Sequence, residues 1–192
     1  MPFSTSFQAS EPYTLGVELE FQLLDLNTCN LTPAAPSLLA KVPPELSAKI
    51  KPEFIESMVE VATGVCSDIN QVEEDLRSTC RVLEKISRES GCFIFSSSLH
   101  PFAKFKEQKV TNIERYKALM EDLRMAGQRL ISQGLHVHVG LTDGQTAIRV
   151  SDSIRMYLPL LLAVSTSSPF FEGDDTGFFS YRSRLLDGLA RS

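Results

Sequence analysis

Residues 13–25, which read YTLGVELEFQLLD, decide the fold. Apolar side chains occupy every second position from Tyr13 to Leu23, and Thr, Gly, Glu, Glu and Gln lie between them. Because successive side chains of a strand point to opposite faces, this alternation predicts a strand with one apolar face. Glu18 and Glu20 then lie side by side on the other face, roughly 6.5–7 Å apart at Cα. The strand needs a packed layer on one side and offers a polar surface on the other.

Residues 49–66, KIKPEFIESMVEVATGVC, fit two structures. Apolar–polar alternation and the β-branched residues at 59, 61, 63 and 65 favour a strand. The spacing of Glu53, Ser57 and Glu60 also matches one face of a helix. In a regular strand Glu53 and Glu60 would face opposite sides unless a bulge lies between them. We therefore predict a strand, with Pro52 near its start or at a bulge.

Three longer helices and two further strands complete the pattern. The helices are expected at 68–90, 111–134 and 143–164, and the strands at 92–98 and 135–141. Capping boxes open the first two helices, formed by Asp68 with Gln71 and by Thr111 with Glu114. Pro159 is expected to kink the third helix. The tail after it begins as a loop rich in Gly, Asp and Arg.

One-sided strands interleaved with helices indicate an α+β fold. The sheet is expected to be antiparallel, with helices packed on its apolar face and a working site on its polar face. No repeat or linker divides the sequence, so residues 1–192 are expected to form a single domain.

Composition argues against several classes of protein. Of the 192 residues, 43% are hydrophobic and 22% are charged, which is typical of a chain with a buried core. A net charge of −5 without a basic cluster argues against nucleic acid as a partner. No export signal is evident and the apolar run at 157–164 is too short to span a bilayer, so we expect a cytoplasmic protein without membrane contact. The four cysteines form no CxxC pair and are expected to be reduced, mostly buried thiols.

Motifs for several common chemistries are missing from the sequence. It contains no GxxxxGK[ST] and no GxGxxG, so a nucleotide would not be held by a P-loop or a Rossmann turn. It also contains no GxSxG, and no cysteine adjoins a histidine. Covalent catalysis therefore has no support in the sequence.

Paired acids and paired histidines are the candidate functional residues. Glu18 and Glu20 share a strand face, where two carboxylates repel each other unless a cation or solvent lies between them. Oxygen ligands of this kind suit Mg²⁺. His136 and His138 also share a face and could hold one metal or one phosphate. Each pair has a plainer interpretation, as the solvated outer face of a strand.

Glu53, Glu56 and Glu60 form a third acidic group. If two of them shared the face of Glu18 and Glu20, the sheet would carry an acid-lined hollow. Taken alone, three glutamates within one short segment are more often surface charge than metal ligands.

Six short motifs run in one order along nearly the whole chain. They are GVELEF (16–21), ESMVEVATGVC (56–66), HPF (100–102), ERY (114–116), GLHVHVG (134–140) and SSPFFEGDDTGFFSYRS (167–183). Their order resembles that of the type 2 glutamate–cysteine ligase family, also called carboxylate–amine ligases. One small departure is Phe171, where the family often has Trp after SPF.

The resemblance implies an ATP-dependent ligase that uses Mg²⁺ or Mn²⁺. In such enzymes ATP phosphorylates a carboxylate, for which glutamate is the default by family name, and an amine, such as that of cysteine, displaces phosphate to form an amide. This would place the protein in glutathione biosynthesis, with small-molecule substrates as its partners. The implied fold is similar to the curved antiparallel catalytic sheet of glutamine synthetase, with metals and nucleotide on the concave face.

The resemblance also implies roles for single residues. Glu18 and Glu20 match the metal ligands of the family's first strand, and Glu53 and Glu60 match the acids of its second. His136 matches a catalytic histidine near metal and phosphate, and His138 lies beside it as a substrate or nucleotide contact. Arg115 and Arg182 match groups that bind substrate carboxylate or phosphate, Arg182 being also a candidate catalytic residue.

Members of the family are about twice as long as this chain, and the resemblance covers their N-terminal half. We therefore expect the chain to correspond to part of a longer ligase, to lack activity alone, and to expose a sheet edge that could favour self-association. Two other functions stay open. One is a metal-dependent hydrolase built on His136 and His138 with Glu60, and the other is a non-catalytic folded fragment or binding module.

Overall fold

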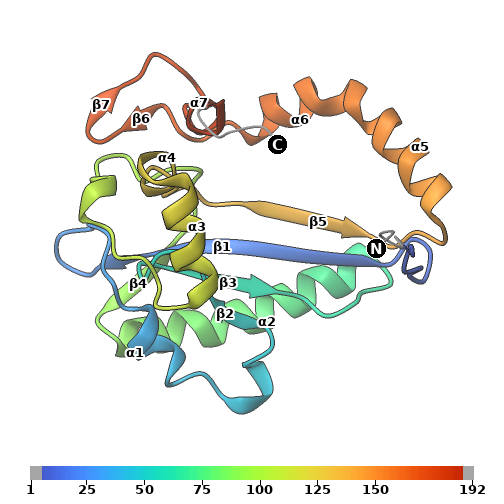
Figure 1. The fold of residues 1–192 in the computed structure, drawn as a ribbon. Helices are drawn as coiled ribbons and strands as arrows, with labels where there is room; N and C mark the ends of the chain where they lie inside the picture. The colour runs from blue at the N-terminus through green and yellow to red at the C-terminus, as the bar shows by residue number, and fades with distance from the viewer. Residues whose placement is uncertain (1–5, 188–192) are drawn as a thin grey trace.

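A computed structural model describes residues 6–187 of the chain (Figure 1). Its main sheet contains β1 (Leu15–Asp25), β2 (Ile50–Pro52), β3 (Met58–Ala62), β4 (Cys92–Phe95) and β5 (Leu135–Val139), and a small hairpin contains β6 (Phe170–Phe171) and β7 (Asp174–Asp175). The α-helices are α1 (Ala35–Leu39), α2 (Ile69–Glu89), α3 (Glu114–Leu123), α4 (Met125–Gln128), α5 (Gly144–Ile154), α6 (Leu158–Ser165) and α7 (Arg182–Asp187). Short 3₁₀ turns lie at Pro44–Leu46, Phe105–Glu107 and Arg155–Tyr157.

The long strand β1 organises the sheet. On one side it pairs antiparallel with β3, which in turn pairs antiparallel with β2. On its other side β1 pairs antiparallel with β5 along its first half and with β4 along its second half. The predicted α+β fold with an antiparallel sheet is therefore confirmed.

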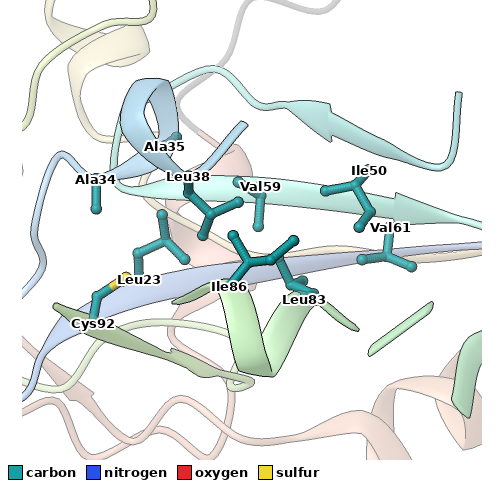
Figure 2. Close-up of a cluster of buried hydrophobic side chains, with 10 residues drawn as sticks. All are labelled: Leu23, Ala34, Ala35, Leu38, Ile50, Val59, Val61, Leu83, Ile86 and Cys92. Carbon is teal, nitrogen blue, oxygen red and sulfur yellow. The ribbon is translucent and has the colours of Figure 1, made fainter. Parts of the chain in front are cut away.

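Helices α1 and α2 cover the apolar face of the sheet. Leu23, Val59 and Val61 project from the strands and are fully buried, and they pack against Leu83 and Ile86 of α2 (Figure 2). The cap predicted for α2 is present, because the Asp68 carboxylate accepts hydrogen bonds from the amides of Asn70 and Gln71. This layer is the core on which the rest of the sheet is built.

A second, smaller core lies on the opposite face. Tyr116 of α3 and Ile131 pack against Phe54, Ile55 and Met58 beside the start of β3. The polar face is thus closed at one end, and the carboxylates discussed below lie on its remaining part.

Residues 49–66 form a hairpin and not the single strand that the alternation predicts. Strand β2 ends at Pro52, the chain turns, and β3 begins at Met58. Glu53 lies in the connection, so it needs no bulge to reach the same side of the sheet as Glu60. The parity argument failed because it assumed one continuous strand.

Two predicted helices are interrupted. The helix expected at 111–134 divides into α3 and α4 at Arg124, which adopts a positive φ of 49°. Its predicted capping box is wrong: α3 begins after Ile113 without a side-chain cap, and the Thr111 hydroxyl donates to the backbone carbonyl of Glu53. The helix expected at 143–164 is divided by a 3₁₀ turn, and Pro159 lies in the first turn of α6.

Gln133 joins the two short strands beside β1. Its side-chain nitrogen donates to the carbonyls of Glu20 and Phe95, at 3.0 and 2.7 Å, and its side-chain oxygen accepts from the amide of Ser97 at 2.8 Å. Gln133 is 6% exposed. One buried amide thus holds β1, the end of β4 and the approach to β5 together.

Residues 144–165 contain α5, the 3₁₀ turn and α6, and we call this segment the arm. It lies beyond the free edge of β5 (Figure 1). No residue of these elements is buried. The chain then returns: the amide of Ser98 donates to the Ser167 hydroxyl, and the amide of Gly173 donates to the carbonyl of Pro101. The tail predicted to begin as a loop therefore contains a hairpin and helix α7.

The four cysteines are free thiols. Cys66 and Cys92 are buried and Cys80 is half-buried, but Cys29 is exposed, in the turn that follows β1. No helix within residues 6–187 combines the length and apolar character needed to cross a bilayer.

Candidate active site on the polar face of the sheet

Strand register brings charged residues of four segments onto the polar face. Glu20 of β1 lies directly opposite Glu60 of β3, and Glu60 lies opposite Lys51 of β2. Two residues along β1, Glu18 lies opposite His136 of β5. Because side chains of directly paired residues project to the same face, these five residues form two adjoining rows across the sheet.

Glu18 contacts both histidines of the sequence motif. Its Oε2 lies 3.2 Å from His136 Nδ1 and 3.3 Å from His138 Nε2. Hydrogen bonding to His138, and less strongly to His136, lowers the pKa of the Glu18 carboxyl. The Glu18 side chain is 31% exposed and the two imidazoles are at least half exposed, so all three are open to solvent and to a ligand.

Glu20 is more buried than Glu18 and lies deeper in the site. Burial raises the pKa of the Glu20 carboxyl, and the negative charge of Glu60 raises it further. The amide of Gly134 opposes this by donating to Glu20 Oε2 at 2.7 Å, and the charges of His136 and Arg182 also oppose it. Glu20 is thus fixed by the backbone and surrounded by groups of both signs.

Glu53 approaches the same carboxylates from the turn between β2 and β3. Burial raises its pKa, and the charges of Glu20 and Glu60 act in the same direction. Its own neighbour, Phe54, donates a backbone hydrogen bond to the carboxylate. Glu20, Glu53 and Glu60 therefore converge closely enough to repel one another.

Glu56, the remaining acid of that segment, has a different position. It lies in the turn between β2 and β3, where its backbone amide donates to the carbonyl of Lys109 and its carbonyl accepts from the amide of Ala35. Glu56 is not among the causes of the pKa shifts of Glu18, Glu20 and Glu53. The structure therefore does not bring it together with the other three.

Two arginines border the carboxylates from outside the sheet. Arg115 of α3 donates to the Tyr116 hydroxyl at 3.0 Å, and its charge opposes the rise in the pKa of Glu53. Arg182 begins α7, and its charge acts on Glu20. The Nε of Arg182 is buried and has no hydrogen-bond partner among residues 6–187, so within this part of the chain the guanidinium retains an unsatisfied donor.

Lys51 is a member of the site that the sequence did not single out. Its ammonium lies 3.7 Å from Glu60 Oε1, and its side chain is 46% exposed. A hairpin between 49 and 62 would have placed Lys51 opposite Glu60, so the signal was present but was hidden by the assumption of one strand.

The donor chemistry of the site suits a hard divalent cation. Burial and mutual repulsion disfavour the ionised forms of Glu20 and Glu53, and a bound cation would relieve both effects. As the side chains stand, no three His, Cys, Asp or Glu residues within 6–187 are grouped closely enough to hold a metal ion. The arrangement offers oxygen ligands from three segments and not a finished coordination shell.

Comparisons with known proteins point to one family. The model of glutamate–cysteine ligase family 2 matches residues 14–189. A protein of Gloeobacter violaceus, provisionally named glutamate–cysteine ligase 2, is 44% identical over 186 residues, which cover 96% of this chain and 50% of that protein. A protein of the same provisional name from Jannaschia is 39% identical and is matched over 49% of its length. This chain spans about half the length of the curated relatives it matches.

A solved structure shares the fold. The crystal structure of a glutamate–cysteine ligase from Francisella tularensis in complex with AMP aligns with a TM-score of 0.50. The alignment covers 78% of this chain and 31% of that one, at 15% identity. The likeness at this identity concerns the arrangement of strands and helices.

Proposed function

We propose that this chain, which belongs to glutamate–cysteine ligase family 2, supplies the acidic half of the active site of an ATP-dependent carboxylate–amine ligase. One observation carries the proposal: Glu18, Glu20, Glu53 and Glu60 converge on one sheet face that is bordered by Arg115 and Arg182. Such a surface suits anionic substrates that must be held together with a cation.

The proposed reaction joins a carboxylate to an amine through an acyl phosphate. ATP donates its γ-phosphoryl group to the carboxylate, and attack by the amine nitrogen then forms the amide and releases phosphate. Glutamate and cysteine are the proposed substrates, because relatives of this chain carry that name. Glutathione biosynthesis and a cytoplasmic location follow from the same proposal.

The acidic residues are proposed to hold divalent metal. Glu18, Glu20, Glu53 and Glu60 would be its ligands, and Mg²⁺ or Mn²⁺ would neutralise phosphate charge when bound. Glu20 is suited to this role by its fixed position, because the Gly134 amide restrains one carboxylate oxygen and leaves the other available.

The cationic residues are proposed to hold the anionic substrates. Arg182 has a buried Nε with no hydrogen-bond partner in the described part of the chain, so an incoming phosphate or carboxylate oxygen would satisfy that donor. Arg115 is oriented by the Tyr116 hydroxyl and by its position over the Tyr116 ring, 4.8 Å from the centroid. Planar guanidinium groups bind such oxygens in pairs.

Calorimetric titration with ATP, with and without Mg²⁺, tests the proposal. Glu18→Gln should weaken Mg²⁺-dependent binding at least about tenfold, because it removes one negative charge from the ligand set. Glu45→Gln changes an exposed glutamate of the Pro44–Leu46 turn and is the matched control. Both variants should melt within about 2 °C of the parent chain, since neither side chain is in the core. A large fall in melting temperature for Glu18→Gln alone would instead indicate a structural role.

The two histidines are expected to differ in importance. His136→Ala should lower amide-forming activity more than His138→Ala does, because the charge of His136 acts on Glu20 as well as on Glu18. Activity is to be measured as ADP release with glutamate and a panel of amines, using this chain together with the remaining half of a relative. Equal and small effects of the two substitutions would contradict the role proposed for His136.

The length of the relatives favours one second possibility, a folded half that is not active alone. Absence of Mg²⁺–ATP binding by a cooperatively folded chain would support it. Metal binding without any effect of nucleotide would instead favour the hydrolase built on His136 and His138.

A further inference from the structure

The structure exposes an apolar surface that has the composition of a core. Leu135, Val137 and Val139 of β5 are 50–63% exposed, although they lie on the same sheet face as Val17, which is 7% exposed beneath α2. Helix α2 covers β1 and β3 and does not reach β5. The apolar face of the sheet therefore continues one strand further than the layer that covers it.

The free edge of β5 presents unpaired backbone groups. Among the described residues, β5 pairs only with β1. The amide of Glu20 donates to the carbonyl of Gly134, and the amide of Gly140 donates to the carbonyl of Thr14. Because bonded and non-bonded pairs alternate in an antiparallel ladder, His136 and His138 also bond to β1, and the backbone groups of Leu135, Val137 and Val139 point outward.

The β1 side of the ladder supports this assignment. The carbonyl of Val17, the residue opposite Val137, accepts from the amide of Thr63 on the far side of β1. Likewise Leu15, opposite Val139, exchanges backbone hydrogen bonds with Cys66. The outward groups of β5 are thus available to a further strand.

The arm adds a second apolar surface beyond that edge (Figure 1). Helix α6 reads LPLLLAVS, and its Leu158, Leu160, Leu161 and Leu162 are 47–61% exposed. Ile148 and Ile154 of α5 are also exposed. A helix that is apolar on all sides is typical of a buried position, so these side chains lack the layer that would cover them.

We infer that this surface, made of the β5 edge and the arm, is the docking surface for the remaining half of a family 2 polypeptide. That half would add a strand to β5, continue the sheet beneath the arm, and cover the side chains of α5 and α6. Two facts support this occupant. The curated relatives are about twice as long as this chain, so about half of their residues lie outside the match, and the matched region already includes β5 and the arm. The inference rests on family membership and not on the proposed chemistry.

Co-expression with the remaining half of the Gloeobacter violaceus relative tests the inference. The matching first half of that relative, expressed with it in parallel, shows that the probe is competent. We expect the two polypeptides to co-purify as a one-to-one complex. In the complex, hydrogen exchange at the amides of Leu135, Val137 and Val139 and along the arm should slow by roughly tenfold or more relative to the chain alone.

Two variants test each part of the surface separately. Val137→Pro removes an outward amide that β1 does not use, so it should block strand addition and leave the β1–β5 ladder in place. Leu161→Asp places a charge on α6. Each should lower the yield of complex at least about fivefold, whereas Val65→Asp, at a residue 82% exposed outside this surface, should not. Leu161→Asp keeps the test decisive if Val137→Pro does not fold.

Three results would overturn the inference. One is failure of this chain to co-purify with the remaining half of the relative while the relative's own two halves form a complex. Another is a complex in which the amides of β5 and the arm exchange as fast as in the chain alone. The third is a dimer of this chain, seen by light scattering, in which the same amides are protected, because the surface would then bind a second copy.

Discussion

The two sides of β1 carry similar apolar residues, but these residues are buried on one side and exposed on the other. On the β3 side, Leu23, Val59 and Val61 are buried beneath α2. On the β5 side, Leu135, Val137 and Val139 and the leucines of α6 are at least 47% exposed. The comparison shows that apolar patterning specifies which face of a strand seeks cover, whereas burial requires a second layer to be present.

Truncation of one leucine on each side of β1 should give the largest difference in stability between the two regions. Leu83→Ala creates a cavity in the layer beneath β1 and β3 and should lower the free energy of unfolding by about 3 kcal/mol. Leu161→Ala in the arm should lower it by less than about 0.5 kcal/mol, because that side chain makes few buried contacts. Urea denaturation of both variants measures the difference. Equal losses would mean that the arm is as tightly packed as the core.

The buried histidine His100 makes the stability of the fold depend on pH. His100 is 1% exposed, its Nε2 lies 2.9 Å from the carbonyl of Cys29, and its Nδ1 accepts from the amides of Phe102 and Ala103. Burial lowers the pKa of His100 below its ordinary value of 6.5. The folded state therefore binds fewer protons than the unfolded state just below pH 6.5, and stability falls as the pH drops through that range.

We expect the His100 effect to be an intermediate one. The free energy of unfolding should fall with a slope of up to about 1.4 kcal/mol per pH unit below pH 6.5, and this contribution should be flat above it. His100→Gln keeps a neutral donor and acceptor and should remove that part of the slope. Urea denaturation between pH 5 and 8 measures it. An unchanged slope in His100→Gln would assign the pH dependence to other groups.

The helix caps give the smallest expected effects. Asp68 caps α2, and Asp143 caps α5 by accepting from the amide of Thr146 at 2.9 Å. Asp68→Ala should lower the free energy of global unfolding by about 1 kcal/mol, which is typical of a lost cap. Asp143→Ala should leave global unfolding almost unchanged and loosen α5 locally, as hydrogen exchange would show. A global loss from Asp143→Ala would mean that the arm unfolds together with the core.

Short-range sequence patterns correctly predicted the elements that depend on residues close together in the sequence. The alternation in 13–25 and 135–141 gave β1 and β5 together with the side on which Glu18, Glu20, His136 and His138 lie, and Asp68 marked the start of α2. These features depend on side-chain period and capping, which a short window contains.

The errors arose where distant contacts decide the local structure. Thr111 could have capped a helix, but its hydroxyl donates to the carbonyl of Glu53, 58 residues away. The helix breaks at Arg124, where neither Pro nor Gly is present to indicate a break in the sequence. Lys51 was missed because its partner Glu60 is defined by a hairpin. The roles of the individual site residues rest on the family resemblance and stay predictions.

Gln133 shows how much can depend on a single atom. Its side-chain nitrogen supplies donors to the carbonyls of Glu20 and Phe95, and its oxygen serves the amide of Ser97. Exchange of that nitrogen for oxygen, as in Gln133→Glu, would preserve the shape of the residue and take the Gln133 donor away from two partly buried carbonyls. Shortening to Asn would withdraw the whole group. Neither of the two nearest chemical neighbours of glutamine can therefore replace it, although neither would look disruptive on a substitution scale based on size or polarity.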